Sequence, residues 1–232
     1  MKRPPTRKIG ITGHTSGIGK EIYEHCMFKG HDVTGYSRAT GFNILEKDAD
    51  NIINDILRKD IDVVFNNAWV PKLQIKILKV LHQQWKDREG KFIISTGSAS
   101  IYQAGLTGEV YQQDKKELRD YSINAALQWP YKNACRVSNV SLGWTNTALV
   151  GDTYENFIDP YEAALVLLNM MEYQDYVIPE VIISNKMQPP EEVDPIRDRA
   201  AAHMGASIIQ SNKMMLEKNS PTLSKIYDSR EK

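Results

Sequence analysis

Two side chains that can take part in proton transfer, Tyr111 and Lys115, lie four residues apart near the middle of the sequence. On the helical segment that we expect there, this spacing puts them on one face. A free tyrosine has a pKa of about 10 and gives up its proton poorly at neutral pH, but a nearby ammonium favours the phenolate and lowers that pKa. Ser98, 13 positions before Tyr111, adds a hydroxyl that can hold a carbonyl oxygen. The three residues are therefore candidates for carbonyl reduction, in which the developing alkoxide needs a proton.

A glycine-rich segment near the N-terminus, Thr12–Gly19, has the composition of a phosphate-binding turn. Glycines can adopt positive φ and let the backbone approach a ligand closely. The helix that we expect to begin near Gly17 points its free N–H groups and its positive dipole end at such a ligand, which suits a pyrophosphate. Because the turn lies between a predicted strand and a predicted helix, it indicates a dinucleotide site. The candidate contacts in this segment are Gly13, Ser16, Gly17, Ile18 and Gly19.

The residues after the second predicted strand indicate which dinucleotide binds. A carboxylate there would accept a hydrogen bond from a ribose 2′-hydroxyl and repel a 2′-phosphate. The chain has Ser37 and Arg38 instead, and an arginine can pair with a phosphate through two hydrogen bonds. The sequence thus favours NADP(H) over NAD(H), with a solvated Arg38 that binds nothing as the alternative interpretation. His14, within the glycine-rich segment, either contacts the cofactor or faces solvent.

Five motifs of the sequence, spread over about Lys8 to Ser184, resemble those of the short-chain dehydrogenase/reductase family in type and in order. The spacing of Tyr111 and Lys115 alone is close to what chance gives in a chain with 11 tyrosines, so the accompanying motifs carry the resemblance. They are Thr12-Gly13-x-x-x-Gly17-Ile18-Gly19, Asn66-Asn67-Ala68 with Trp69 in place of a glycine, Ser98, the pair Tyr111 and Lys115, and Gly143 to Thr147 with Leu142 in place of a proline.

The resemblance implies an NADP(H)-dependent oxidoreductase that interconverts a carbonyl and an alcohol by hydride transfer. In the family's pattern Tyr111 is the general acid or base, and Ser98 holds the substrate oxygen. Lys115 lowers the tyrosine pKa and binds the nicotinamide ribose, so it is also a cofactor contact. The further cofactor contacts that the resemblance implies are Asn43 and Ile44 near the adenine, the strand-end residues Asn67 and Ala68, and Thr147 near the pyrophosphate or carboxamide.

Three departures from the family pattern keep a second interpretation open. The family has an asparagine upstream of the serine, where it supports a water-linked proton relay. At the corresponding distance before Ser98 this chain has Gln74 instead. The helix expected after the second strand is nearly absent, and the connection from Trp69 to Gln74 is short. Trp69 itself either caps the cofactor cleft or is an ordinary core or interface aromatic. The missing helix, the absent relay asparagine and the added C-terminal tail indicate the alternative function, a non-catalytic, NADP(H)-sensing relative that binds a protein partner.

Apolar, β-rich runs alternate with helical patterns along the chain, which indicates βαβ units around a parallel sheet. We predict a single Rossmann-type α/β domain with a doubly wound parallel sheet of about seven strands. Residues 1–188 form this NADP-binding catalytic domain, and residues 189–232 form a polar, partly helical extension. The predicted strands are Lys8–Thr12, Asp32–Tyr36, Phe42–Ile44, Asp62–Asn66, Phe92–Ser95, Arg136–Leu142 and Val181–Ser184. The predicted helices are Gly17–Lys29, Leu45–Lys59, Pro71–Lys86, Glu109–Gln128, Tyr161–Tyr173 and, in the extension, Pro195–Lys218.

The bulk composition argues against several classes of protein. Lys plus Arg and Asp plus Glu both total 29, so no basic excess exists to bind nucleic acid. No apolar run is long enough to span a membrane, and residues Met1 to Lys8 lack the apolar core of a signal peptide. Cys26 and Cys135 have no metal-ligand spacing, and free thiols in a reducing compartment fit them better than a disulfide. We expect a soluble cytoplasmic protein without a metal.

The expected partners are a small-molecule carbonyl or alcohol substrate and further copies of the chain. The predicted helices Pro71–Lys86 and Glu109–Gln128 resemble the pair that members of the family bury in dimer and tetramer interfaces. We therefore expect a homodimer or a homotetramer.

Overall fold

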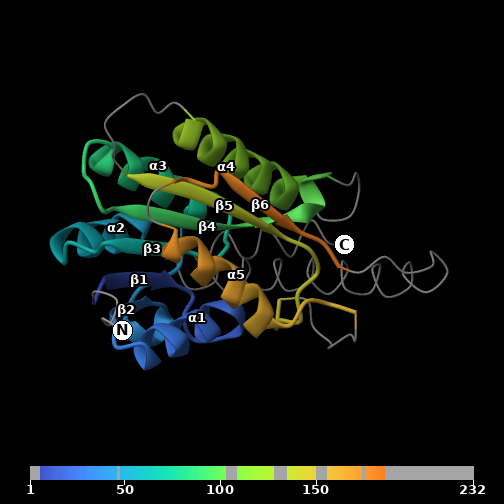
Figure 1. Ribbon diagram of the computed structural model, residues 1–232, viewed down its shortest axis with the longest axis horizontal. Helices are drawn as coiled ribbons and strands as arrows, with labels where there is room; N and C mark the ends of the chain where they lie inside the picture. The colour runs from blue at the N-terminus through green and yellow to red at the C-terminus, as the bar shows by residue number, and fades with distance from the viewer. Residues whose placement is uncertain are drawn as a thin grey trace, which may run out of the picture.

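The sheet at the centre of the fold is parallel and carries its strands in a wound order. The computed structural model describes residues 6–45, 48–102, 109–127, 135–149, 156–173 and 176–185. Within them six strands lie in the order β2-β1-β3-β4-β5-β6 (Figure 1). The chain runs outward from β1 to β2 and then returns past β1 to β3, so the winding reverses beside β1, as in a doubly wound sheet. The strands are β1 (Lys8–Thr12), β2 (Asp32–Tyr36), β3 (Val63–Asn66), β4 (Phe92–Ser98), β5 (Arg136–Leu142) and β6 (Glu180–Ile183).

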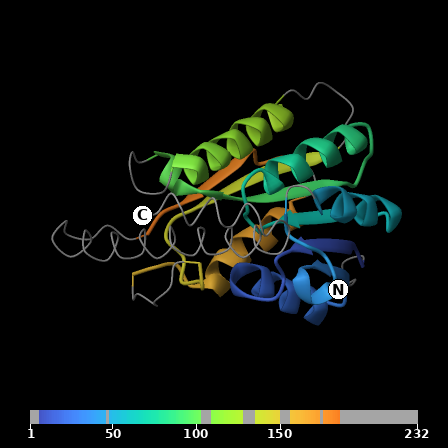
Figure 2. The same ribbon diagram turned by 180° about the vertical axis from the view of Figure 1, so that it is seen from behind.

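Helices cover both faces of this sheet. α1 and α5 pack together on one face, and α2, α3 and α4 cover the other (Figure 1). Seen from behind, α3 and α4 lie side by side over their face (Figure 2). No helix in the described part of the chain is long and apolar enough to cross a membrane. The helices are α1 (Gly17–Phe28), α2 (Ala49–Arg58), α3 (Leu73–Trp85), α4 (Glu109–Leu127) and α5 (Pro160–Glu172), with the 3-10 turns η1 (Arg38–Thr40) and η3 (Ala99–Tyr102).

The central strands are buried on both faces, which explains their continuous apolar runs. In β3, Val63 and Phe65 belong to the core under α1 and α5, whereas Val64 belongs to the core under α2, α3 and α4. β4 repeats the alternation with Ile94 and Ile93. The helices therefore rest on two separate apolar layers, and the polar ends of the strands are left at the sheet edge.

The predicted strand at Phe42–Ile44 is wrong, and the described sheet has six strands where about seven were expected. A parallel neighbour needs a crossover of roughly a dozen residues, and too few separate Tyr36 from Phe42. The chain instead turns at Gly41, where φ is 84°. Phe42 then packs its ring edge-on against Tyr36, with 4.9 Å between the ring centroids. The loop thus adds to the core under α2 without adding a strand.

The predicted Rossmann-type α/β fold is otherwise confirmed, with element ends that differ by a few residues. β4 continues to Ser98, beyond its expected end at Ser95, and α2 begins at Ala49 where Leu45 was expected. The predicted helix Pro195–Lys218 and the extension at 189–232 lie outside the described residues, so the division of the chain at residue 188 stays a prediction.

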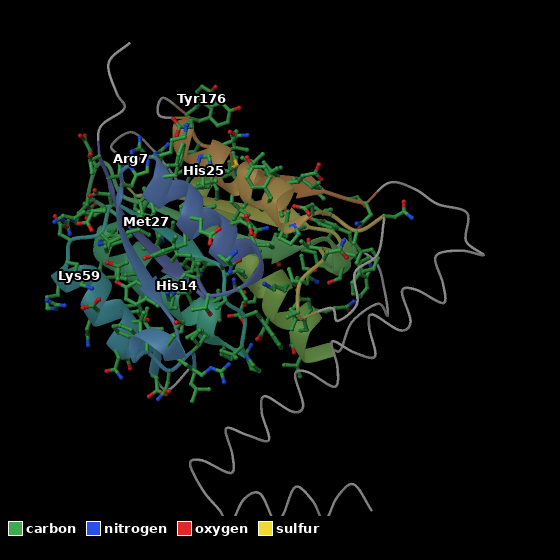
Figure 3. The ribbon with its side chains drawn as sticks, turned by 90° about the horizontal axis from the view of Figure 1, so that it is seen from below. Arg7, His14, His25, Met27, Lys59 and Tyr176 are labelled. Atoms are coloured by element: carbon green, nitrogen blue, oxygen red, sulfur yellow. The ribbon has the colours of Figure 1, made fainter. Side chains whose placement is uncertain are left out.

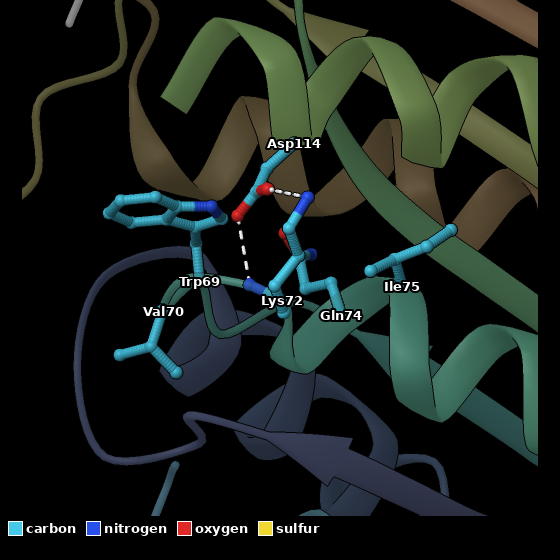
Figure 4. Close-up of a pocket in the computed structure, with 6 residues that line it drawn as sticks. All are labelled: Trp69, Val70, Lys72, Gln74, Ile75 and Asp114. Atoms are coloured by element: carbon cyan, nitrogen blue, oxygen red, sulfur yellow. Dashed lines mark hydrogen bonds and ion pairs between the residues drawn. The ribbon is translucent and has the colours of Figure 1, made fainter. Parts of the chain in front are cut away.

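A buried carboxylate on α4 docks this helix onto the start of α3. Asp114 Oδ2 accepts a hydrogen bond from the backbone N–H of Lys72 at 2.9 Å, and Oδ1 lies 2.9 Å from Lys72 Nζ (Figure 4). Lys72 precedes α3 with φ at 63°, and a lysine side chain cannot accept the N–H groups at a helix start. Asp114 therefore supplies, from a neighbouring helix, the negative charge that a helix N-terminus favours.

We predict that Asp114→Ala lowers the free energy of unfolding by about 1–3 kcal/mol, because a part-buried backbone N–H at the start of α3 loses its acceptor. Glu117→Ala, on the same helix, is the matched control. Glu117 pairs with Lys72 and Lys79 on the surface, and such pairs contribute about 0–1 kcal/mol. Urea denaturation of both variants checks this difference. Equal losses would show that Asp114 contributes no more than a surface ion pair.

Candidate active site

Most of the residues that the sequence predicts for the site gather at one edge of the sheet, where the strands have their carboxyl ends. The glycine-rich loop follows β1, Asn67 and Ala68 follow β3, and Ser98 ends β4. Thr147 lies in the segment after β5. Ligands of doubly wound sheets bind at this edge, beside the point where the winding reverses.

The loop between β1 and α1 is a tight cradle of backbone. Gly13 and Gly17 have positive φ, 73° and 52°. A Cβ on Gly19 would lie 2.2 Å from the carbonyl oxygen of Gly13, so no other residue fits there. A Cβ on Gly13 would lie 2.9 Å from Cβ of Ala68, and one on Gly17 would lie 3.1 Å from Cγ2 of Thr147. The structure therefore brings the loop, Ala68 and Thr147 into contact, as a shared ligand site requires.

The start of α1 is open to a ligand. Ser16 takes the N-cap position but its side chain makes no capping hydrogen bond, and the first turn of α1 holds no acidic residue. Ser16 is exposed, and Ile18 packs against the core under α1 and α5. The first N–H groups of α1 thus face the loop without competition from a side chain.

The end of β2 holds a pinned turn without an acidic residue. Thr40 Oγ1 accepts a hydrogen bond from Ser37 N–H at 3.1 Å and donates to the Gly35 carbonyl at 2.8 Å. Ser37 is buried, and Arg38 is exposed to solvent. Asn43 and Ile44 lie beyond the turn, Asn43 exposed and Ile44 packed against the core under α2.

His14 is packed against the protein. A Cβ on Gly35 would lie 2.3 Å from His14 Cγ, and the His14 ring lies 5.0 Å from that of Tyr23 on α1. Burial lowers the pKa of His14, against the opposing effect of a hydrogen bond to the Tyr36 backbone. The imidazole lies beside Gly35 of β2 at the start of α1 (Figure 3). A contact between His14 and the cofactor stays a prediction.

Hydrogen bonds join the ends of β1, β3 and β4. Thr12 Oγ1 accepts from the backbone N–H groups of Asn67, at 2.9 Å, and Ala68, at 3.0 Å. Asn67 Nδ2 donates to the Thr12 carbonyl at 3.3 Å, and Asn67 Oδ1 accepts from Thr96 Oγ1 at 3.1 Å. The loop after β1 is thereby tied to β4.

Ser98 and Tyr111 meet at the end of β4. Both side chains are buried, and a hydrogen bond joins them. Burial raises the pKa of Tyr111, and the hydrogen bond with Ser98 partly offsets this. Ser98 Oγ also lies 2.8 Å from Ser100 Oγ. In the absence of other charges this tyrosine keeps its proton at neutral pH.

Lys115 lies behind the tyrosine, in the interior between α4 and the sheet. Its Nζ donates to Gln74 Oε1 and to the Thr96 carbonyl, each at 2.7 Å, and lies 5.4 Å from the centroid of the Tyr111 ring. Burial lowers the pKa of Lys115 to about 7, although the charge of Asp114 acts in the other direction. An ammonium has three N–H donors, and the described residues engage two of them.

Gln74 and Trp69, which the sequence left open, both border this centre. Gln74 is buried and touches Lys115 through its amide oxygen. The Trp69 ring stands edge-on to that of Tyr111, with 4.8 Å between centroids. Both residues line a small pocket together with Val70, Lys72, Ile75 and Asp114 (Figure 4). Trp69 therefore packs against the tyrosine itself.

Thr96 and Asp114 also border the site, although neither was predicted from the sequence. Spacing was the available signal: Thr96 lies two residues before Ser98 on one strand face, and Asp114 lies three residues after Tyr111 on one helix face. No group of three His, Cys, Asp or Glu side chains within the described ranges could hold a metal ion.

Comparison by sequence finds no matching family model and no matching curated protein. Solved structures do match. A 3-alpha-hydroxysteroid dehydrogenase from Pseudomonas sp. B-0831, complexed with NADH, has a TM-score of 0.64 at 16% identity, over 76% of this chain and 95% of its own. An alcohol dehydrogenase from the archaeon Thermococcus sibiricus, complexed with 5-hydroxy-NADP, has a TM-score of 0.62 at 15% identity, over 80% and 99%.

A third match is a short chain dehydrogenase from Burkholderia cenocepacia in complex with NADP. It has a TM-score of 0.59 at 16% identity and covers 77% of this chain and 95% of its own. At these identities the likeness concerns the fold. The short-chain dehydrogenase/reductase fold that the sequence motifs predicted is thereby confirmed.

The lowered pKa of Lys115 has a consequence for stability. The unfolded chain keeps this proton up to about pH 10, whereas the folded chain releases it from about pH 7. Between these values the unfolded state binds more protons, so the Lys115 contribution to the free energy of unfolding rises with pH, by at most about 1.4 kcal/mol per unit.

We therefore predict that the wild type gains stability relative to Lys115→Met between pH 7 and pH 9. Urea denaturation of both proteins at the two pH values measures the change, and the subtraction cancels the other titrating groups. A constant difference would mean that the Lys115 pKa is not lowered in the folded chain.

Proposed function

Because the chain has the short-chain dehydrogenase/reductase fold, we propose that it is an NADP(H)-dependent oxidoreductase that interconverts a small carbonyl compound and an alcohol. The observation that carries the proposal is the hydrogen bond between Ser98 and Tyr111 beside the buried Lys115. These groups lie at the edge of the sheet that also holds the glycine-rich loop. The solved neighbours with NADH, NADP or 5-hydroxy-NADP support a nicotinamide cofactor.

The residues of the loop fit a dinucleotide. Glycine at 19 leaves the backbone carbonyl of Gly13 uncovered, and the start of α1 lacks a side-chain cap. Both features favour a pyrophosphate against the first N–H groups of the helix. We assign its binding to Gly13, Ser16, Gly17, Ile18 and Gly19, with Asn67, Ala68 and Thr147 beside it and Asn43 and Ile44 toward the adenine.

The preference for NADP(H) rests on the end of β2. No carboxylate stands there to repel a 2′-phosphate, and Ser37 ends the strand with Arg38 beside it. The exposed guanidinium can turn toward a phosphate and pair with two of its oxygens. The preference stays part of the proposal, because the neighbours were solved with both kinds of cofactor.

The proposed chemistry divides between the cofactor and three side chains. The bound nicotinamide would supply or accept the hydride. Ser98 donates a hydrogen bond to the carbonyl oxygen, and Tyr111 donates the proton that the developing alkoxide needs; in oxidation Tyr111 takes a proton from the alcohol. Lys115 stabilises the phenolate left on Tyr111, and its remaining N–H can bind the cofactor's ribose.

The homodimer or homotetramer expected from the sequence stays a proposal. α3 and α4 lie side by side on one face of the sheet. α4 exposes the apolar side chains of Val110 and Leu127 near its two ends, and these fit an assembly through this pair of helices.

We predict that Tyr111→Phe lowers the rate of carbonyl reduction by about 10²–10⁴-fold, the contribution of a positioned proton donor, with NADPH affinity nearly unchanged. Tyr121→Phe is the matched control: Tyr121 is also on α4, but its hydroxyl lies 3.1 Å from His82. NADPH absorbance with a panel of carbonyls gives the rate, and NADPH fluorescence gives the affinity. Turnover that persists in Tyr111→Phe would refute the role of Tyr111.

We further predict that Arg38→Ala weakens NADPH binding by about 10- to 100-fold, equal to 1.4–2.8 kcal/mol, and leaves NADH binding unchanged. The physical reason is the loss of a charge-assisted pair with the 2′-phosphate. Arg88→Ala is the control, since Arg88 pairs with Asp60 at the opposite end of the strands. Calorimetric titration with both cofactors measures the effect. Equal weakening of NADPH and NADH, or no weakening, would contradict 2′-phosphate recognition by Arg38.

A further inference from the structure

The amide group of Gln74 has a fixed orientation inside the protein. Its Nε2 faces three backbone carbonyl oxygens, those of Asn66 at 2.6 Å, Thr96 at 3.2 Å and Asn67 at 3.4 Å. If the amide were flipped, Oε1 would face these carbonyl oxygens and the N–H groups would face the Lys115 ammonium, and both contacts would be repulsive. Oε1 must therefore point away from them, and it points at Lys115.

The backbone around Gln74 reinforces this arrangement. The Gln74 carbonyl accepts a hydrogen bond from Asn66 Nδ2 at 2.8 Å, so the first turn of α3 is held to the end of β3 from both directions. Gln74 itself is 3% exposed. The side chain thus has no freedom to leave Lys115 without breaking bonds to β3 and β4.

Lys115 depends on this neutral contact. A buried ammonium without partners costs several kcal/mol, and the described residues give Lys115 two hydrogen-bond acceptors, Gln74 Oε1 and the Thr96 carbonyl. Neither is a carboxylate. The nearest acid, Asp114, turns its oxygens to Lys72. A neutral acceptor orients the lysine and still lets it gain and lose its proton.

We propose that Gln74 is a positioning residue for the reaction: its amide oxygen accepts a hydrogen bond from Lys115, favours the protonated form of this lysine and keeps it in the place from which it acts on Tyr111. The part that concerns catalysis rests on the proposed function. The part that concerns Lys115 stands on the contact alone.

Few other titrating groups face Lys115 in the described structure. On its own helix they are Tyr111 and Asp114. From α3 the contacting group is the neutral amide of Gln74, and from β4 it is the backbone carbonyl of Thr96. A change at Gln74 should therefore act on Lys115 directly.

The test is the proton titration of Lys115 in the full chain, followed by NMR of lysine labelled at Cε, with Lys115→Met to assign the signal. Gln74→Met keeps the length of the side chain and removes the acceptor, so the pKa of Lys115 should fall by about one unit or more. Gln74→Glu puts a carboxylate in its place, and the pKa should rise by about one unit or more. Gln83→Met, at an exposed position of the same helix, should change nothing.

The pH at which carbonyl reduction declines should move with these values, downward in Gln74→Met and upward in Gln74→Glu. A purely structural role would lower the melting temperature of the variants and leave the titration of Lys115 where it is in the wild type; that result overturns the proposal. If Gln74→Met does not fold, the near-isosteric Gln74→Glu provides the test: an unchanged Lys115 pKa in this variant overturns the proposal.

The failure of the proposed function would look different. Wild-type protein that reduces no carbonyl with NADPH would remove the catalytic part, while opposite shifts of the Lys115 titration would still support the contact. If the wild type turns over but the pKa of Lys115 does not change in the Gln74 variants, the proposed function stands and the role of Gln74 is overturned.

Discussion

A positive charge buried between α4 and the sheet is the constraint on which the rest of the site depends. Water does not reach Lys115, so its ammonium must find oxygens within the protein. β4 supplies a backbone carbonyl and α3 supplies the amide of Gln74. These contacts require α3 and α4 to stay in register, and the bond from Asp114 to the start of α3 holds them there. Tyr111, on the same face of α4, is positioned by the same docking.

The proton-transfer centre and the glycine-rich loop belong to one hydrogen-bonded body. Thr12 binds the backbone after β3, Asn67 binds Thr96, and the Thr96 carbonyl binds Lys115. The first two bonds join the ends of neighbouring strands of the parallel sheet, whose carboxyl ends must meet at one edge, and the third joins β4 to α4. The wound strand order therefore brings together residues that are far apart in the chain. Trp69, which follows β3, packs edge-on against the ring of Tyr111.

Much of this was predictable from the sequence, because local signals specify it. Residues close together in the sequence determine the glycine turn of the loop and the burial pattern of the strands. The same holds for the helix face that Tyr111 and Lys115 share. The strand expected at Phe42 was wrong since the link is too short for a parallel crossover. The contact between Gln74 and Lys115 could not be predicted from the sequence, because the two residues lie 41 positions apart. The orientation of the Gln74 amide depends on backbone carbonyls at the ends of two strands, β3 and β4.

The central claim is that the protein reduces a carbonyl compound with a hydride that comes from NADPH. Its most direct measurement is label transfer: the protein is incubated with NADPH that carries deuterium at the transferable position and with a panel of carbonyl compounds, and the products are analysed by mass spectrometry. We expect loss of NADPH absorbance and an alcohol that contains one deuterium at the former carbonyl carbon. Tight binding of NADPH with no oxidation by any carbonyl would contradict this claim and would favour a protein that senses NADP(H).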